Sequence, residues 1–101
     1  MAGTVIVTGG SRGIGRGIVS GLASSGHNII FTYCNNENAA RETKLSITEK
    51  YGIAAHYVQA DFISDTKGSS QRCFEMFDNE FPSTSFKGFV HNAGGTYKLS
   101  S

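Results

Sequence analysis

The strongest restriction on the fold of this chain comes from a glycine-rich segment at positions 8–15, TGGSRGIG, which separates two apolar stretches of different periodicity. Before it, residues 4–8 form a short β-branched run, which is typical of a strand buried on both faces of a parallel sheet. After it, apolar residues recur at helical spacing until Ser25 and Gly26, namely Ile14, Ile18, Val19 and Leu22. The segment therefore predicts a strand, a tight turn and a helix in direct succession.

The same succession of strand and helix recurs along the chain. Three further runs are typical of strands, at residues 28–33, 54–59 and 86–91. Asn36 can cap a helix that runs to about Lys50 and ends at Gly52, and Ser64 or Asp65 can cap the next helix. Strands that alternate with helices over about 25 to 30 residues indicate parallel βαβ units with right-handed crossovers. We therefore expect a three-layered α/β fold.

Each of the two later helices has apolar residues that we expect to face the sheet. In the helix after Asn36 they include Ala40, Leu45 and Ile47. In the last helix the apolar stripe consists of Cys73, Phe74, Met76 and Phe77. Gly68 is expected to weaken the first turns of that last helix by about 1 kcal/mol.

The composition removes several classes of function. The 101 residues carry 9 Lys and Arg against 8 Asp and Glu, so the chain lacks the massed positive charge on which binding to nucleic acids or anionic membranes depends. This length allows one domain at most, and no apolar run approaches the roughly 18 residues of a transmembrane helix. Cys34 and Cys73 have no partners at metal-binding spacing, and no secretory signal is seen. We expect reduced thiols, no metal site and a cytoplasmic protein.

The glycine-rich segment has the properties of an anion-binding site. A helix N-terminus offers unpaired backbone N–H groups and a partial positive charge. Gly9 would allow the tight turn, Gly13 would let the backbone approach a pyrophosphate, and Gly15 would let the helix pack closely on the sheet. No Gly-Lys-Ser/Thr follows, which excludes a nucleoside triphosphate P-loop. The alternative is that these glycines only make a tight turn.

Three motifs in order resemble the N-terminal half of the short-chain dehydrogenase/reductase family. They are the glycine-rich segment, Asp61-Phe62 after the third strand and Asn92-Ala93-Gly94 after the fourth. The 3-oxoacyl-[acyl-carrier-protein] reductases look most similar. The resemblance implies a Rossmann-type doubly wound parallel sheet with strand order 3-2-1-4 and an NADPH-dependent reduction of a carbonyl to an alcohol, as in fatty acid biosynthesis.

The resemblance also implies roles for the residues at the strand ends. Asp61 would accept a hydrogen bond from the adenine amino group with the Phe62 backbone beside it, and residues 92–94 would line the adenine-ribose side. Open α/β sheets do bind ligands at the carboxyl ends of their strands. The alternatives are that Asp61 is only a helix-cap or turn residue and that Asn-Ala-Gly is only a turn. The predicted cofactor-binding residues are Gly9, Ser11, Arg12, Gly13, Ile14, Gly15, Tyr33, Asn35, Asp61, Phe62, Asn92, Ala93 and Gly94.

The end of the second strand favours NADP(H) over NAD(H). An NAD site places an acid about 20 residues beyond the glycine loop, where it binds the ribose 2′-hydroxyl. That place falls near Tyr33, and the first carboxylate after it is Glu37. A 2′-phosphate would instead be bound by the Arg12 guanidinium, for which a solvated surface position is the alternative.

No catalytic residue is assigned in the 101 positions. In this family a Ser precedes a Tyr and a Lys that lie four residues apart, whereas Tyr97 and Lys98 are adjacent and Ser100 follows them. Strand order 3-2-1-4 would leave residues 86–91 as an edge strand with Phe89 and Val90 uncovered. We expect residues 1–101 to be the N-terminal part of one NAD(P)-binding domain of a longer reductase.

Three functions remain open at this stage. The first is a reductase acting on a small or acyl-carrier-bound carbonyl substrate, and the resemblance implies a homo-oligomer. The second is a non-catalytic dinucleotide-binding module or truncated fragment without turnover. The third is an α/β scaffold that binds no nucleotide.

Overall fold

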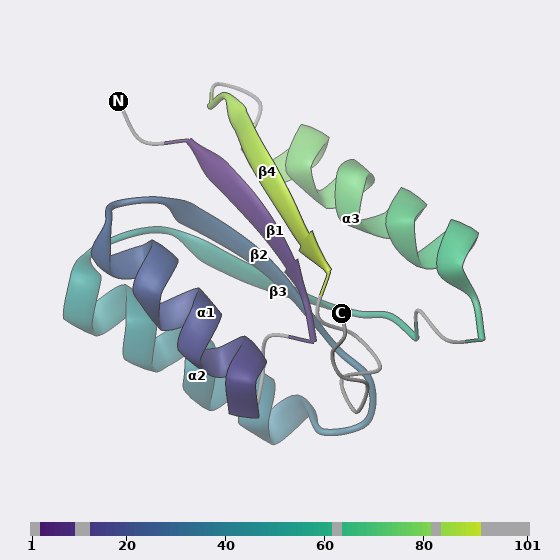
Figure 1. The fold of residues 1–101 in the computed structure, drawn as a ribbon, viewed down its shortest axis with the longest axis horizontal. Coiled ribbons are helices and arrows are strands. Elements are labelled where there is room, and N and C mark those ends of the chain that lie inside the picture. The colour runs from purple at the N-terminus through teal and green to yellow at the C-terminus, as the bar shows by residue number, and fades with distance from the viewer. Residues whose placement is uncertain (1–2, 10–12, 62–63, 82–83, 92–101) are drawn as a thin grey trace.

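The computed structural model describes residues 3–9, 13–61, 64–81 and 84–91, which form four strands and three helices in strict alternation (Figure 1). The strands are β1 (Thr4–Thr8), β2 (Asn28–Tyr33), β3 (Ala55–Gln59) and β4 (Phe86–His91). The helices are α1 (Gly13–Ser24), α2 (Glu37–Tyr51) and α3 (Thr66–Glu80). The predicted order of elements is confirmed, and the third strand begins one residue later than expected.

The four strands form one parallel sheet in the order β3-β2-β1-β4. Figure 1 shows α1 and α2 on one face of this sheet and α3 on the other, so the predicted three-layered, doubly wound arrangement is confirmed. β1 lies between two neighbours, and all five of its residues are buried. This burial explains why its sequence is apolar and β-branched without a polar face.

Alternate residues of the strands feed two separate apolar clusters. Val5, Val7 and Phe31 pack with α1 and α2, whereas Ile6 and Ile30 pack with Cys73 of α3. Successive side chains of a strand point to opposite faces, so one buried strand serves both layers. The sheet is therefore fixed from both sides.

The predicted helix caps are present. The Asn36 side chain accepts a hydrogen bond from the Ala39 N–H at 3.0 Å, and α2 ends at Gly52 with φ of 70°. Of the two candidate caps for α3, Asp65 takes the role, since its Oδ1 accepts from the Gly68 N–H at 3.1 Å. Caps of this kind satisfy donors that the first helical turn leaves open.

One apolar residue expected to face the sheet, Leu45, does not, and a second, Phe74, is only partly covered. Leu45 is 51% exposed, and Thr43 takes the buried position beside Ala40 and Ile47. The positions of Ala40, Thr43 and Ile47 follow helical spacing, and the Thr43 hydroxyl donates to the Ala39 carbonyl at 2.9 Å, so burying it leaves that donor satisfied. In α3, Phe74 is 41% exposed, although its ring contacts aromatic rings of β4.

Aromatic residues of α3 and β4 gather beside β4, which is an outer strand among the described residues. The Phe74 ring lies 5.5 Å from the ring of Phe86 and 5.9 Å from that of Phe89. Phe86 is 42% exposed. The expectation that Phe89 and Val90 are uncovered is wrong in degree, because both are half-buried and pack against the two clusters. The exposure is concentrated at Phe86 and Phe74 instead.

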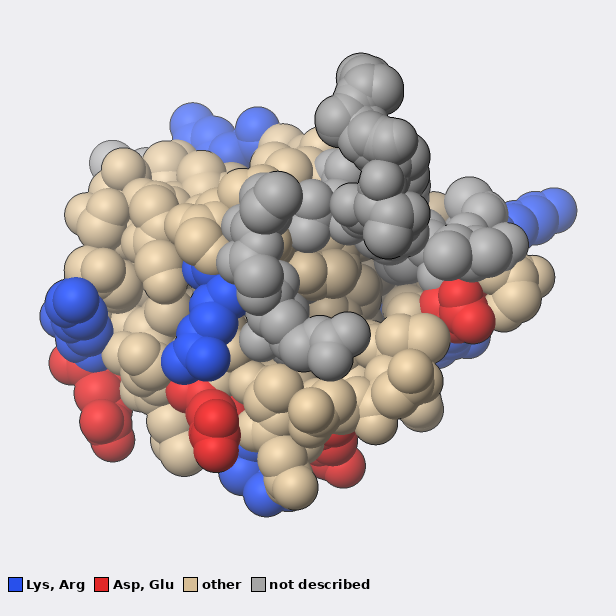
Figure 2. All heavy atoms as spheres, turned by 60° about the horizontal axis from the view of Figure 1, so that its bottom comes forward, with Lys and Arg blue, Asp and Glu red and all other residues tan. Residues whose placement is uncertain are grey.

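Charged side chains are dispersed over the surface. On the face shown in Figure 2, several Lys and Arg side chains lie close to Asp and Glu side chains and others stand among uncharged residues, and no broad area of described residues carries one sign. Among the described residues, no helix combines the length and the apolar character that crossing a membrane requires.

Candidate functional site

The parallel sheet brings the carboxyl ends of all four strands to one edge (Figure 1). Gly9 follows β1, Cys34 follows β2 and Asp61 lies two residues after β3. Residues distant in sequence thus meet at a single edge, which is where open α/β sheets bind ligands. The candidate site is built here.

The turn after β1 depends on Gly9. Its φ of 70° lies in the left-handed region, which a side chain disfavours. The Gly9 N–H donates to the Oγ1 of Thr32 at 2.8 Å, and Thr32 is buried near the end of β2. This hydrogen bond ties the start of the glycine-rich segment to the neighbouring strand.

Helix α1 begins with an electrostatic preference for anions. It starts at Gly13, and its first turn contains no acidic residue. Its helix dipole is therefore not offset by a carboxylate of that turn. Gly15 is buried, as expected of a residue at which the helix packs closely on the sheet.

Tyr33 contributes to the site edge through its main chain. Its carbonyl accepts from the Ala60 N–H at 2.9 Å. Its ring lies 5.6 Å from the ring of Tyr57 and packs against the apolar cluster below α1 and α2. Desolvation, followed by the Glu37 carboxylate and the Tyr57 phenol, raises the pKa of Tyr33.

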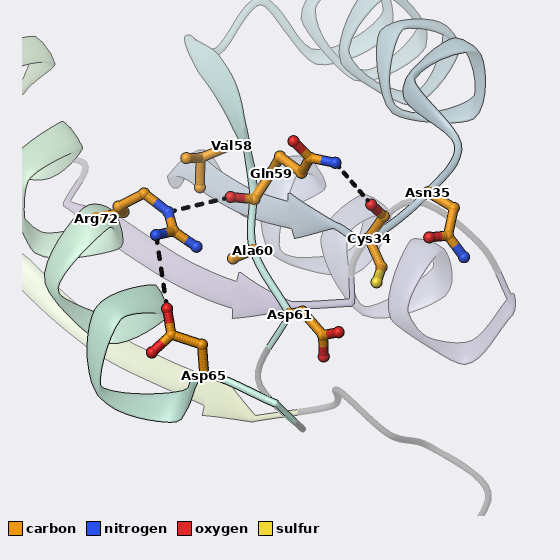
Figure 3. Close-up of a pocket in the computed structure, with 8 residues that line it drawn as sticks. All are labelled: Cys34, Asn35, Val58, Gln59, Ala60, Asp61, Asp65 and Arg72. Carbon is orange, nitrogen blue, oxygen red and sulfur yellow. Dashed lines mark hydrogen bonds and ion pairs between the residues drawn. The ribbon is translucent and has the colours of Figure 1, made fainter.

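An open pocket of about 760 Å³ lies where β2 and β3 end (Figure 3). Its lining consists of Cys34, Asn35, Val58, Gln59, Ala60, Asp61, Asp65 and Arg72. In Figure 3, Arg72 and Asp65 lie on one side of the β3 chain, and Cys34, Asn35 and Asp61 lie on the other. Two predicted site residues, Asn35 and Asp61, therefore line one pocket.

Hydrogen bonds fix the loop that carries Asp61. Its Oδ1 accepts from the Ser64 N–H at 3.2 Å, and its carbonyl accepts from the Asp65 N–H at 2.9 Å. The predicted alternative, a turn role for Asp61, is thus present in the structure. A carboxylate has several acceptor positions, so this role is compatible with a further hydrogen bond to a ligand.

The remaining predicted residues differ in what can be said of them. Gly13 and Ile14 open α1. Six predicted residues lie outside the described residues: Ser11, Arg12, Phe62, Asn92, Ala93 and Gly94. Within residues 3–9, 13–61, 64–81 and 84–91, no group of three His, Cys, Asp or Glu side chains could hold a metal ion.

Sequence reasoning missed three residues of the pocket wall, Cys34, Gln59 and Arg72, which link β2, β3 and α3. Gln59 Nε2 donates to the Cys34 carbonyl at 3.0 Å, and Arg72 Nε donates to the Gln59 carbonyl at 3.3 Å. Cys34 itself is exposed. The only available signal was position, because Cys34 and Gln59 are the residues at the ends of neighbouring strands.

Comparison with known proteins shows which protein family and which relatives this chain resembles. The sequence profile of the family described as short chain dehydrogenase matches residues 3–100. The chain is 48% identical over 56 residues to L-rhamnose 1-dehydrogenase (NADP(+)) of Thermoplasma acidophilum, covering 55% of this chain and 22% of that protein. It is 37% identical over 91 residues to the 3-oxoacyl-[acyl-carrier-protein] reductase of Aquifex aeolicus, covering 90% and 35%.

A solved structure gives the same result at the level of fold. The L-sorbose reductase from Gluconobacter frateurii, complexed with NADPH and L-sorbose, superposes with a TM-score of 0.77 at 27% identity. The match covers 100% of this chain and 36% of that one. The chain therefore spans 22 to 36% of the length of these three proteins.

Proposed function

The chain belongs to the short chain dehydrogenase family, and from this membership we propose that the protein is an NADP(H)-dependent oxidoreductase that reduces a carbonyl to an alcohol. The observation that carries the proposal is the shared edge of the sheet. There the Gly9 turn leads into an α1 without acid in its first turn, and Asn35 and Asp61 line one pocket. A dinucleotide needs such a combination, with a diphosphate at the helix N-terminus and an adenosine beside it.

The choice of NADP(H) is supported by the position of Glu37. This residue carries the first carboxylate after β2 and does not line the pocket. Its Oε2 accepts a hydrogen bond from the Tyr57 hydroxyl at 3.5 Å and lies 4.0 Å from Arg41. Because Glu37 lies at the start of α2 and not at the strand end where an NAD site places its acid, we expect it to repel a 2′-phosphate less than such an acid would. Bound NADPH would supply the hydride.

We propose a 3-oxoacyl thioester as the first substrate class to test. The support is the 37% identity to the Aquifex aeolicus reductase over 90% of this chain. The names of two other relatives, L-rhamnose 1-dehydrogenase and L-sorbose reductase, point to sugars, which makes them the natural competing substrates.

The described residues are proposed to form the N-terminal part of one dinucleotide-binding domain. The relatives are longer than this chain, and β4 is an outer strand of the sheet that the described residues form. Beside it lie Phe86 of β4 and Phe74 of α3, which are 42% and 41% exposed. An edge strand bordered by exposed aromatic residues favours pairing with further strands. The catalytic Tyr and Lys would belong to that further part.

Calorimetric titration with NADPH and NADH tests the proposal. The protein is expected to bind NADPH more tightly than NADH, and Arg12→Ala is expected to reduce this difference. A reductase assay with 3-oxoacyl thioesters and ketoses then follows the oxidation of NADPH. Binding without turnover in the native protein would favour a non-catalytic dinucleotide-binding module, and binding of neither coenzyme would overturn the proposal.

A further inference from the structure

Two residues, Cys34 and Asn35, connect β2 to the N-cap of α2 and line the pocket. Both are exposed. The pairing of β2 with β3 ends at Tyr33, whose partner in the register is Gln59. One more main-chain hydrogen bond follows, from the Ala60 N–H to the Tyr33 carbonyl at 2.9 Å. Beyond that bond, the two chains are held together by a side-chain hydrogen bond instead of a main-chain one.

Gln59 provides this side chain. Its Nε2 donates to the Cys34 carbonyl at 3.0 Å (Figure 3). At the other end of the connection, the Asn36 side chain accepts from the Ala39 N–H at 3.0 Å and fixes the start of α2. Asn35 is therefore held between two anchors, one on each side of it in the chain.

The main chain of Gln59 is itself held from α3. Arg72 Nε donates to the Gln59 carbonyl at 3.3 Å. Arg72 Nη1 lies 3.9 Å from the carboxylate of Asp65, the N-cap of α3. Arg72, itself paired with the N-cap of its own helix, thus fixes from α3 the position from which the Gln59 amide reaches Cys34. Support of this kind keeps a binding residue in place before the ligand arrives.

We propose that Gln59 is a positioning residue that sets the preference of the site for NADPH over NADH. The proposal rests on the proposed function, in which the 2′ group of the adenosine ribose binds at the end of β2. A 2′-phosphate has more acceptor oxygens and more charge than a 2′-hydroxyl. Binding of the phosphate therefore depends more on a fixed position of Cys34 and Asn35 than binding of the hydroxyl does. Loosening Cys34 and Asn35 weakens NADPH binding more than NADH binding.

The variant Gln59→Met tests the proposal, because it keeps the length of the side chain and removes the N–H donor. Gln71→Met is the matched control, since Gln71 is exposed on α3 and does not line the pocket. Titration calorimetry gives Kd for both coenzymes, and thermal unfolding verifies the fold. Gln59→Met is expected to raise Kd for NADPH roughly three- to tenfold and that for NADH less than about twofold. Gln71→Met is expected to change neither.

The outcomes separate this proposal from the proposed function. Failure of the native protein to bind either coenzyme would overturn both. Native binding of NADPH together with equal losses for both coenzymes in Gln59→Met, or no loss for either, overturns the role of Gln59 alone. Gln59→Glu gives a second test, because it lacks the donor and adds a negative charge. Undiminished NADPH affinity in that variant also overturns the role.

Discussion

Replacing Gly68 by Ala is expected to act on stability differently from the same replacement at Gly17. Both residues lie in helices, Gly17 in α1 and Gly68 in the first turn of α3. Ala in a helix is more stable than Gly by about 0.5–1 kcal/mol. A Cβ at Gly17 would meet no atom within 4 Å, so the gain is expected in full there.

Gly68 differs because the cap of α3 occupies the space that a side chain would need. A Cβ on Gly68 would lie 2.8 Å from Oδ1 of Asp65 and closer still to Oδ2. The carboxylate would have to move, which breaks its hydrogen bond with the Gly68 N–H. Loss of an N-cap costs about 0.5–2 kcal/mol, which offsets part or all of the helical gain and can exceed it. Gly68→Ala is therefore expected to be about 0.5–2 kcal/mol less stable than Gly17→Ala.

Urea unfolding of a double-mutant cycle measures this effect. Asp65→Ala removes the cap, so in that background the added methyl group displaces nothing, and Gly68→Ala should now stabilise α3. Gly17→Ala should stabilise equally with and without Asp65, because α1 does not contain the cap. The reasoning is refuted if Gly68→Ala stabilises by the same amount in both backgrounds.

Substitution and labelling test three further contacts. Thr32→Val removes the acceptor of the Gly9 N–H and is expected to cost about 1–2 kcal/mol in urea unfolding and to weaken binding of both coenzymes; an unchanged midpoint would contradict this. Iodoacetamide at neutral pH should label exposed Cys34 but spare Cys73, whose pKa burial raises to about 11; two labelled thiols in the folded protein would be the wrong result. Burial lowers the pKa of His56 below 6.5. The unfolded chain therefore binds more protons than the folded one, and the free energy of unfolding falls as pH drops through about 6.5. His56→Gln should flatten this pH dependence of the free energy of unfolding.

The strands and caps were predictable because their signals are local. Asn36 marks the start of α2 through its side chain, and Gly52 marks its end through its backbone conformation. Neighbouring elements do not alter either property. Leu45 was misplaced because hydrophobicity alone does not set the rotation of a helix. Thr43 can fill the core position when its hydroxyl bonds to its own helix.

The candidate site was predictable only in part. Strand ends could be located in the sequence, so Asn35 and Asp61 were placed at the correct edge. The hydrogen bond from Gln59 to Cys34 was not predictable, because it depends on the register between β2 and β3. For Tyr33, position in the chain gave no information on the side chain, which packs on Tyr57.

The central position of β1 has a consequence for how the molecule opens. β1 is hydrogen-bonded to a strand on each side and buried on both faces, so its amide protons exchange with solvent only when the whole sheet separates. The outer strands β3 and β4 can fray singly, and their amides would exchange earlier. Because Gly9 follows β1 directly, the turn that begins the glycine-rich segment is attached to the last part of the protein to come apart.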